Sequence, residues 1–399
     1  MKVLFVTESV PQASSGGSVA TMGVLRALRR GGFDIHLVVN ARPRHLGNLE
    51  VARSLASTLT VVPRPRMRVT PLADWARCMA VHRYVPRWQA GVLDALLAAL
   101  RSERYDLVFL EQIRTAEYGR LLKERGVSVP VALREHNVEH ELNTLLAPEM
   151  DAAQERLETR LRAHRYRAIE THLARYCDLI LPISAVDGAK LGALNPGLPV
   201  GVIPSPVDTD HYRPAPFPPP GKEIVFVGGM GYTPNRDAVT WFSREIFPLV
   251  LARHPDARLV AIGEKPPELL REHGDRAVAP GFVPDERVFV ARGRVFIAPI
   301  RYGSGVRTKI LNALAMERPV VATTLGAEGL ELAPGRELLV ADEPAPFADA
   351  VSALLEDEPR ATALASAGLR ACLDGYSPER VGERLRAAMA LVHGERRAG

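Results

Sequence analysis

Cysteine is scarce in this 399-residue chain, and long apolar runs are missing altogether. The three cysteines, Cys78, Cys177 and Cys372, are odd in number and far apart, which fits neither a disulfide framework nor a C-x-x-C metal site. No window approaches 18 consecutive apolar residues, so no membrane-spanning helix is expected. The apolar run in MKVLFVTESV is too short for a signal peptide. We therefore expect a protein of the reducing cytoplasm.

Charge of one sign is also not in large excess. The 51 basic and 46 acidic residues leave a net charge of +5, which does not by itself indicate a nucleic-acid partner. Only six of the basic residues are lysines, so Lys309 is noticeable. The content of 47% hydrophobic and 24% charged residues is typical of soluble globular proteins, and the length predicts two domains or three.

What is present is a regular alternation of strand and helix. Continuous apolar runs predict parallel strands at residues 3–7, 34–39, 58–62, 106–111, 129–134, 179–182, 200–204, 223–228, 258–263, 277–282, 295–300, 319–323 and 338–342. Helical spacing appears at residues 18–30, 92–102, 344–355, 359–373 and 378–393. The predicted fold class is α/β, with two Rossmann-like doubly wound parallel sheets.

A proline-rich break separates the two predicted sheets. The sequence TDHYRPAPFPPPG cannot continue a helix or a central strand and favours a stiff connector. We predict a first domain at 1–208, a linker at 209–222 and a second domain at 223–376. A last helix and a short basic tail, residues 377–399, are predicted to pack back on the first domain.

The most informative stretch is residues 298–332, APIRYGSGVRTKILNALAMERPVVATTLGAEGLEL. It predicts a strand, a glycine loop, a helix, a second strand and a second glycine loop. Arg307 and Lys309 fall where the first helix begins, and the N-terminus of a helix attracts anions. Together with Gly303, Ser304 and Gly305, they predict a diphosphate site. A solvated basic first turn is the alternative.

Glycine loops also follow the first strand of each predicted sheet. One contains Gly16 and Gly17, and the other contains Gly229. Ligands bind beyond the carboxyl ends of strands in open α/β sheets, so these loops are expected to line a cleft between the two domains. Neither loop is a G-x-G-x-x-G fingerprint, so a nicotinamide enzyme is unsupported. Simple tight turns are the alternative.

Several motifs, taken in order, resemble glycosyltransferase family 4, which is also called group 1. They are the Gly16-Gly17 loop, REHNVE at 134–139, VIPSPVDTDHYRP at 202–214, FVGGMGYTPNRDAVTWF at 226–242 and the segment 300–330. The family consists of GT-B-fold, retaining enzymes that use nucleotide sugars, and the resemblance covers residues 1–392. It implies that nucleotide and phosphates bind the second domain, that the acceptor binds the first, and that no metal or other cofactor is required.

The resemblance and the charge pattern together assign roles. Donors arranged around a leaving phosphate stabilise the charge that grows there, so Arg307 and Lys309 are the predicted catalytic cations. Gly16 and Gly17 are expected to approach the same phosphate. His136 follows the strand 129–134, and a matching histidine in the family contacts the donor sugar. A structural histidine is the alternative reading.

Two departures from the family pattern concern the nucleotide. Ser304 and Asn312 stand where many members have a Glu-x7-Glu pair, so the usual ribose-binding carboxylate is an amide here. Glu328 is a candidate replacement for that contact. GGMGYTPNRD offers only Arg236 where many members have an arginine and a lysine.

Two other motifs are interpreted as structural. Asp208-Thr209-Asp210 has the D-x-D form of metal-dependent transferases but occurs in the connector, where Asp and Thr are common turn formers. The arginine-rich stretch 64–87 is interpreted as a helix with a solvated basic face. Contact with an anionic membrane or a lipid-linked acceptor is its alternative.

The sequence thus predicts a cytoplasmic glycosyltransferase that uses a nucleoside-diphosphate sugar and needs no metal. Its predicted acceptor is a glycan, a lipid-linked intermediate or a small molecule, with peripheral contact at the inner membrane face as one option and no nucleic-acid partner. A GT-B-fold nucleotide-sugar epimerase and a non-catalytic nucleotide-sugar-binding paralogue remain as alternatives.

Overall fold

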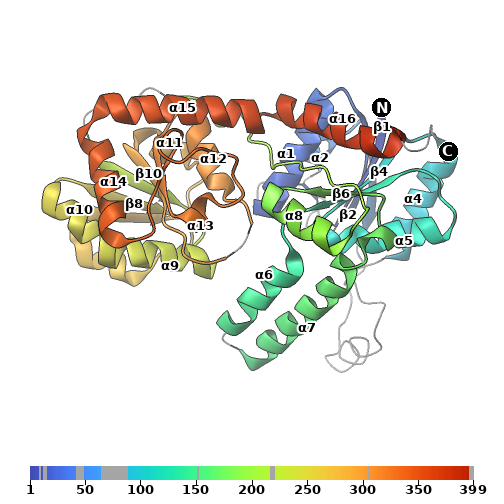
Figure 1. Cartoon of the computed structure of the whole chain (residues 1–399), viewed down its shortest axis with the longest axis horizontal. Helices are drawn as coiled ribbons and strands as arrows, with labels where there is room; N and C mark the ends of the chain where they lie inside the picture. Colours follow the sequence, from blue (N-terminus) through green and yellow to red (C-terminus); the bar gives the residue numbers. More distant parts are fainter. Residues whose placement is uncertain are drawn as a thin grey trace. The chain divides into compact units, whose positions relative to one another are not determined.

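The computed structural model describes residues 1–8, 10–11, 16–41, 49–63, 89–150, 152–215, 221–303 and 305–394. The chain divides into two compact units, of which the first comprises Met1–Pro206 and Pro378–Gly399 and the second comprises Val207–Ser377. Each unit contains one six-stranded sheet (Figure 1). The prediction of two doubly wound parallel sheets is therefore confirmed. The arginine-rich stretch 64–87 lies outside the described residues.

The sheet of the first unit has the strand order β3-β2-β1-β4-β5-β6, and all its strands are parallel. The strands are β1 (Lys2–Thr7), β2 (Asp34–Ala41), β3 (Thr58–Pro63), β4 (Leu107–Glu111), β5 (Val131–Glu135) and β6 (Leu179–Pro182). Val3 and Phe5 of β1 belong to one buried cluster, whereas Leu4 and Val6 belong to another. Because successive side chains of a strand point to opposite faces, helices must cover both faces of this sheet.

Helices from distant parts of the chain provide that cover. They are α1 (Gly16–Arg30), α2 (Glu50–Leu55), α4 (Ala90–Ser102), α5 (Ala116–Glu124), α8 (Ala185–Leu194) and α16 (Pro378–Gly394), with short 3-10 turns η2 (Ile113–Thr115), η3 (Ala147–Glu149) and η4 (Leu173–Arg175). Two more helices, α6 (Glu139–Leu146) and α7 (Ala153–Glu170), pack mainly on each other. Helix α16 packs on α1, and Val381, Leu385 and Met389 of α16 join the same core as Val3 and Phe5. The last helix is therefore part of the core of the first unit.

The second unit repeats the arrangement, with the strand order β12-β11-β10-β7-β8-β9. Its strands are β7 (Glu223–Val227), β8 (Arg258–Ile262), β9 (Ala277–Gly281), β10 (Val295–Ala298), β11 (Val320–Ala322) and β12 (Leu339–Val340). Its helices are α9 (Thr233–Trp241), the π-helical η5 (Phe242–Ile246), α10 (Phe247–Arg253), the 3-10 segment η6 (Glu268–Arg276), α11 (Arg287–Arg292), α12 (Thr308–Ala315), α13 (Thr324–Ala327), α14 (Pro344–Glu356) and α15 (Glu358–Tyr376). Two buried clusters again lie on the two faces of the sheet.

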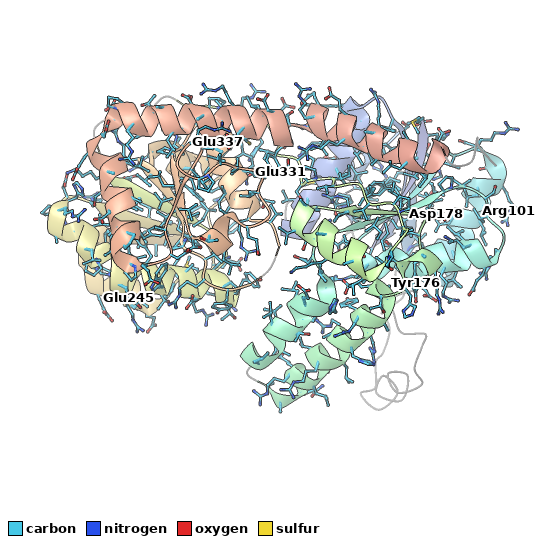
Figure 2. The ribbon with its side chains drawn as sticks, in the orientation of Figure 1. Arg101, Tyr176, Asp178, Glu245, Glu331 and Glu337 are labelled. Atoms are coloured by element: carbon cyan, nitrogen blue, oxygen red, sulfur yellow. The ribbon has the colours of Figure 1, made fainter. Side chains whose placement is uncertain are left out.

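Polar side chains fix where some strands begin. Asp178, labelled in Figure 2, precedes β6 and accepts a hydrogen bond from the Val131 N–H at 2.9 Å. The same carboxylate accepts one from the Lys123 ammonium at 2.6 Å. The first bond ties the start of β5 to the start of β6, and the second ties α5 to the same point; because β5 and β6 are parallel, both strands end at the same edge of the sheet.

The predicted strand at 200–204 is wrong as a strand, because only Val200 forms a bridge, to Ile180. The segment runs beside β6, and the N–H groups of Gly201 and Ile203 donate to the carbonyls of Ile180 and Pro182 at 2.9 and 2.8 Å. Pro182 has no N–H with which to return a bond. The ladder is therefore interrupted after one bridge.

The predicted linker is not a detached connector over its described part. Val207 is buried in the core of the second unit, and the Tyr212 hydroxyl donates to Glu286 at 2.5 Å. The Arg318 guanidinium donates to the carbonyl of Ala215. Residues 207–215 are thus attached to the second unit by a buried apolar side chain and by hydrogen bonds.

Candidate functional site

The predicted phosphate-binding loop lies at the carboxyl edge of the second sheet, between β10 and α12. Helix α12 begins at Thr308, so Arg307 and Lys309 flank its first residue as predicted. Gly303 and Gly305 have φ values of 106° and 86°, which residues other than glycine rarely adopt. The loop therefore requires its glycines. Ser304 lies outside the described residues.

Lys309 occupies an unusual place for a lysine, because it is largely enclosed yet forms no ion pair with a carboxylate among the described residues. Its ammonium donates to the side-chain oxygen of Asn235 at 2.7 Å and lies 4.3 Å from the centre of the Phe226 ring. Burial, together with the neighbouring charge of Arg307, lowers the pKa of Lys309 to about 7. A ligand that carries negative charge would relieve this condition.

The loop after β7 closes around that ammonium. A Cβ added at Gly228 would lie 2.5 Å from the Lys309 Nζ atom and 2.8 Å from the Asn235 amide nitrogen, so a larger residue there would displace the Lys309 ammonium. Gly229 is exposed, a Cβ there would meet no atom within 4 Å, and its carbonyl accepts from the Asn235 amide at 3.0 Å. The sequence interpretation included Gly229 but missed Gly228 and Asn235. Their positions at the end of β7 and the start of α9 were the available signal.

The other predicted residues of the second unit are distributed around Lys309. The Arg307 guanidinium donates to the carbonyl of Gly305; burial lowers the pKa of Arg307, while the charges of Tyr232 and Glu328 counteract that effect. Glu328 is exposed at the end of α13. Asn312 lies one turn after Lys309 on α12, and the two line one small cavity.

Arg236 has a structural contact in this unit. Its Nε atom donates to the carbonyl of Met230 at 3.0 Å. This bond links the start of α9 to the loop after β7, next to Gly228 and Gly229. Arg236 therefore helps to hold the loop in place.

At the carboxyl edge of the first sheet, His136 belongs to a buried charge cluster. One oxygen of Glu111 accepts from Arg134 at 2.9 Å and from the Thr21 hydroxyl at 2.9 Å, and it lies 2.8 Å from Nε2 of His136. The Nδ1 atom of His136 lies 3.3 Å from the Gln112 amide nitrogen. Both ring nitrogens are thus engaged, and the imidazole is held in one orientation.

Glu111 stays ionised at the centre of this cluster. Burial alone would raise the pKa of Glu111, but the charges of Arg134 and His136 hold that pKa below its ordinary value. Burial lowers the pKa of the Arg134 guanidinium, and Glu111 counteracts that change. The two groups therefore depend on each other for their charged forms.

Gly17 lies against the same cluster. A Cβ at Gly17 would come 3.2 Å from the Gln112 amide nitrogen and 3.9 Å from Nδ1 of His136. Gln112 itself has φ 69°, which is rare outside glycine and accumulates at functional sites. Gly17 and His136 are thus together at one edge, and Gly16 is the first residue of α1. The sequence interpretation missed Glu111 and Gln112, although two polar residues directly after an apolar strand were a visible signal.

The D-x-D motif forms a turn. The side chain of Asp208 accepts from the His211 N–H at 3.2 Å, as expected of a turn former. In the part of the chain that the structure describes, no three histidine, cysteine or acidic side chains gather as a metal ion would need.

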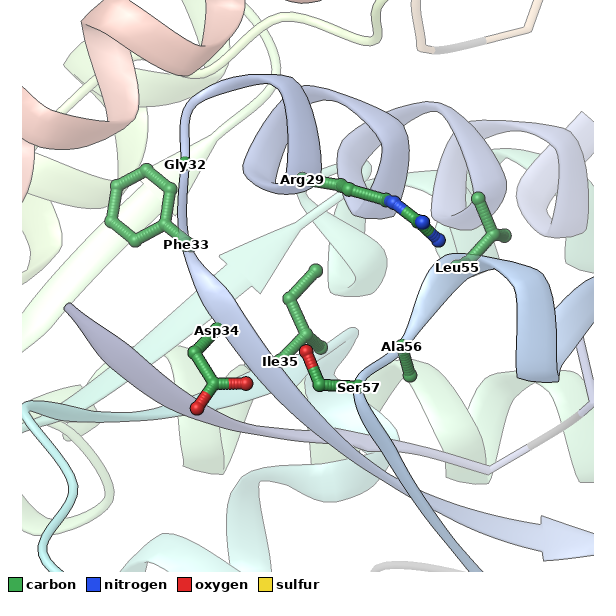
Figure 3. A pocket seen from close by; sticks show the side chains of 8 residues that line it. All are labelled: Arg29, Gly32, Phe33, Asp34, Ile35, Leu55, Ala56 and Ser57. Atoms are coloured by element: carbon green, nitrogen blue, oxygen red, sulfur yellow. The ribbon is translucent and has the colours of Figure 1, made fainter.

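A separate cavity of about 390 Å³ lies at the amino ends of β2 and β3 (Figure 3). It is lined by Arg29, Gly32, Phe33, Asp34, Ile35, Leu55, Ala56 and Ser57. Open α/β sheets bind ligands at the opposite, carboxyl edge, so this cavity is not part of the candidate site. None of the described helices has the length and apolarity needed to cross a membrane.

Comparison with sequence families and curated proteins points to sugar transfer. The model of the family Glycosyl transferases group 1 matches residues 221–357. An uncharacterized 44.6 kDa protein in the cps region of Klebsiella pneumoniae is 26% identical over 135 residues, which make up 31% of this chain and 35% of that protein. The match therefore spans about a third of that relative.

Solved structures share the architecture of nearly the whole chain. Sucrose-phosphate synthase from Thermosynechococcus elongatus has a TM-score of 0.72 at 15% identity and covers 99% of both chains. HepE from Anabaena, solved with UDP and glucose, has a TM-score of 0.65 at 14% identity over 98% of this chain and 100% of its own. At such low identity these likenesses show the fold alone. The chain thus has GT-B architecture, and residues 221–357 of its second unit match the model of the group 1 glycosyl transferases.

Proposed function

We propose that this protein is a retaining glycosyltransferase that moves a sugar from a nucleoside-diphosphate sugar to an acceptor hydroxyl without a metal. The observation that carries the proposal is Lys309, an enclosed ammonium at a helix start with no carboxylate partner among the described residues. A diphosphate is the ligand whose charge suits this place. Because HepE is solved with UDP, UDP-sugars are the first donors to test.

The chemistry follows from where charge develops. When the bond between the anomeric carbon and the diphosphate oxygen breaks, negative charge grows on the leaving phosphate. In this proposal Lys309 and Arg307 stabilise that charge more in the transition state than in the ground state. The new bond joins the anomeric carbon to the acceptor oxygen, and the acceptor proton passes to the leaving phosphate. No protein base is needed in this scheme.

In the first unit, His136 and Gly17 are proposed to contribute to donor recognition. The Glu111 carboxylate and the Gln112 amide hold the imidazole in one orientation at the edge where the donor is proposed to bind. The acceptor is proposed to be a glycan, a lipid-linked intermediate or a small molecule that binds the first unit, with the reaction in the cytoplasm.

The proposal is tested by replacing the two cations. Arg307→Ala and Lys309→Ala should each lower kcat by roughly tenfold or more, because each removes a donor to the transition state. Lys222→Ala, just before the amino end of β7, is the matched control and should keep its turnover. Unchanged kcat in both site variants would reject the assignment.

Asn312 favours one competing function, a non-catalytic protein that binds nucleotide sugars. An amide in place of an ionised acceptor weakens the contact that the ribose diol would make. The two functions differ in turnover but not in binding. Transfer or hydrolysis from any nucleotide sugar, lost in Lys309→Ala, would exclude the competing function. Donor binding with no turnover across UDP-, GDP- and dTDP-sugars would favour it.

A further inference from the structure

Helices α6 and α7 form an antiparallel pair that follows directly after the His136 cluster (Figure 1). The base of the pair is fixed by Glu170 at the end of α7. Its carboxylate accepts from the N–H groups of Glu139 and His140, at 2.6 and 3.1 Å, and lies 2.5 Å from Nδ1 of His140. Glu170 therefore caps the start of α6 and holds the His140 ring in place.

A cavity of about 420 Å³ lies between these helices. It is lined by His140, Thr144, Ala147, Pro148, Arg160, Ala163, His164 and Arg167. On α7, residues three and four apart lie on one face, so Arg160, His164 and Arg167 present their side chains together. The cavity thus has a small apolar floor and a rim of basic and polar groups.

The charge of this rim is not balanced by the described residues. Neither Arg160 nor Arg167 has an ion pair or a side-chain hydrogen bond with any described residue, and both are exposed. Over residues 156–167, α7 carries five arginines and one histidine against a single acidic residue, Glu158. Like charges one turn apart destabilise a helix. An anion in the cavity would offset that repulsion.

We propose that this cavity is a second anion site, which binds a phosphate-bearing group. Guanidinium groups pair with phosphate through two parallel hydrogen bonds, and two arginines spaced by seven residues lie roughly 10 Å apart along a helix. This spacing suits a group held between two cationic arms with His164 in the middle. Assigning the phosphate to the sugar acceptor, whether free or lipid-linked, rests on the proposed function; the binding site itself does not.

The experiment measures binding without turnover, in a Lys309→Ala background so that the donor site does not contribute. Glycerol 3-phosphate is titrated by calorimetry, and vesicles of phosphatidylglycerol in phosphatidylcholine are tested by sedimentation. Arg160→Ala and Arg167→Ala should each weaken binding roughly tenfold, as expected for one lost charge-assisted bond. Arg162→Ala, an exposed arginine outside the cavity on the same helix, is the matched control and should bind as the background does.

The outcomes separate the two sources of phosphate. If Arg160→Ala and Arg167→Ala lose glycerol 3-phosphate binding, the site exists and binds a free phosphate ester. If they lose only vesicle binding, the site exists and binds a lipid headgroup. Equal binding by all three variants would overturn the proposal, as would no binding of either probe by the background protein. Circular dichroism checks that each variant keeps its helices.

Discussion

The charged side chains at the carboxyl edges of the two sheets differ in whether they are paired with an opposite charge. In the first unit, Arg134 and His136 converge on one oxygen of Glu111, so the charges are balanced within the protein. In the second unit, Lys309 has an amide and an aromatic ring as partners and, within the described residues, no carboxylate. A balanced cluster holds its own geometry, whereas an unbalanced one favours an anionic ligand. The first edge therefore holds its own side chains in place, whereas the second leaves a positive charge with which an anionic ligand could pair.

The largest effect is expected from Glu111→Gln, which removes the negative charge from the balanced cluster. The buried Arg134 guanidinium would lose its counter-charge, so the free energy of unfolding should fall by about 3–5 kcal/mol. Urea denaturation at pH 7 measures this, with Glu155→Gln, an exposed glutamate on α7, as the control. If the free energy of unfolding falls no more than in the control, Glu111 does not stabilise the buried Arg134 guanidinium.

Lys309→Met should raise the free energy of unfolding of the ligand-free protein, whereas Glu111→Gln lowers it. The pKa of Lys309 falls from its ordinary value of 10.5 to about 7 in the fold, so the unfolded chain binds more protons between those values. Wild-type stability from this group therefore rises with pH over that window, and at pH 7 the variant should be more stable by about 4 kcal/mol. Denaturation at pH 7 and pH 9.5 tests both statements. A variant that is less stable at pH 7 would contradict the unbalanced reading of the second edge.

The smallest effect is expected from Glu135→Gln, on the strand that also carries Arg134. Burial raises the pKa of Glu135 well above its ordinary value, and Glu170 and Glu139 add to the increase. The folded protein therefore binds more protons, and wild-type stability falls as pH rises from about 4.5 towards the raised value. The variant should be more stable than wild type at pH 7, and the difference should disappear below pH 4. Thermal unfolding across this pH range measures the difference, and a constant difference at all pH values would refute the explanation.

The sequence predicted the parts of the molecule that depend on local pattern. Apolar runs located both sheets, and the glycine loop before Arg307 located the start of α12. What it missed depends on contacts between distant segments. The hydrogen bond between Lys309 and Asn235 joins residues 74 positions apart, and the fit of Gly228 against both follows from that contact.

The prediction of a strand at 200–204 was wrong for a comparable reason, because it depended on the neighbouring segment. Its apolar residues have the right pattern, but its neighbour in β6 is Pro182, which cannot donate to the ladder. The positive φ of Gln112 likewise depends on the packing around β4 and β5 rather than on its own side-chain type. Local pattern therefore located the edges of both sheets, while the side chains that complete each site required the fold.

The position of α16 has a consequence for how the chain is made. Residues 378–394 complete the core of the first unit, so ribosomes must synthesise all of Val207–Ser377 before that core can close. At typical elongation rates this delay is roughly ten to thirty seconds. During that time the nascent chain displays the apolar face of α1 where Val381 and Leu385 will later pack. We expect chaperones that recognise exposed apolar surface to bind this face during translation, and a chain stopped before Pro378 to remain bound.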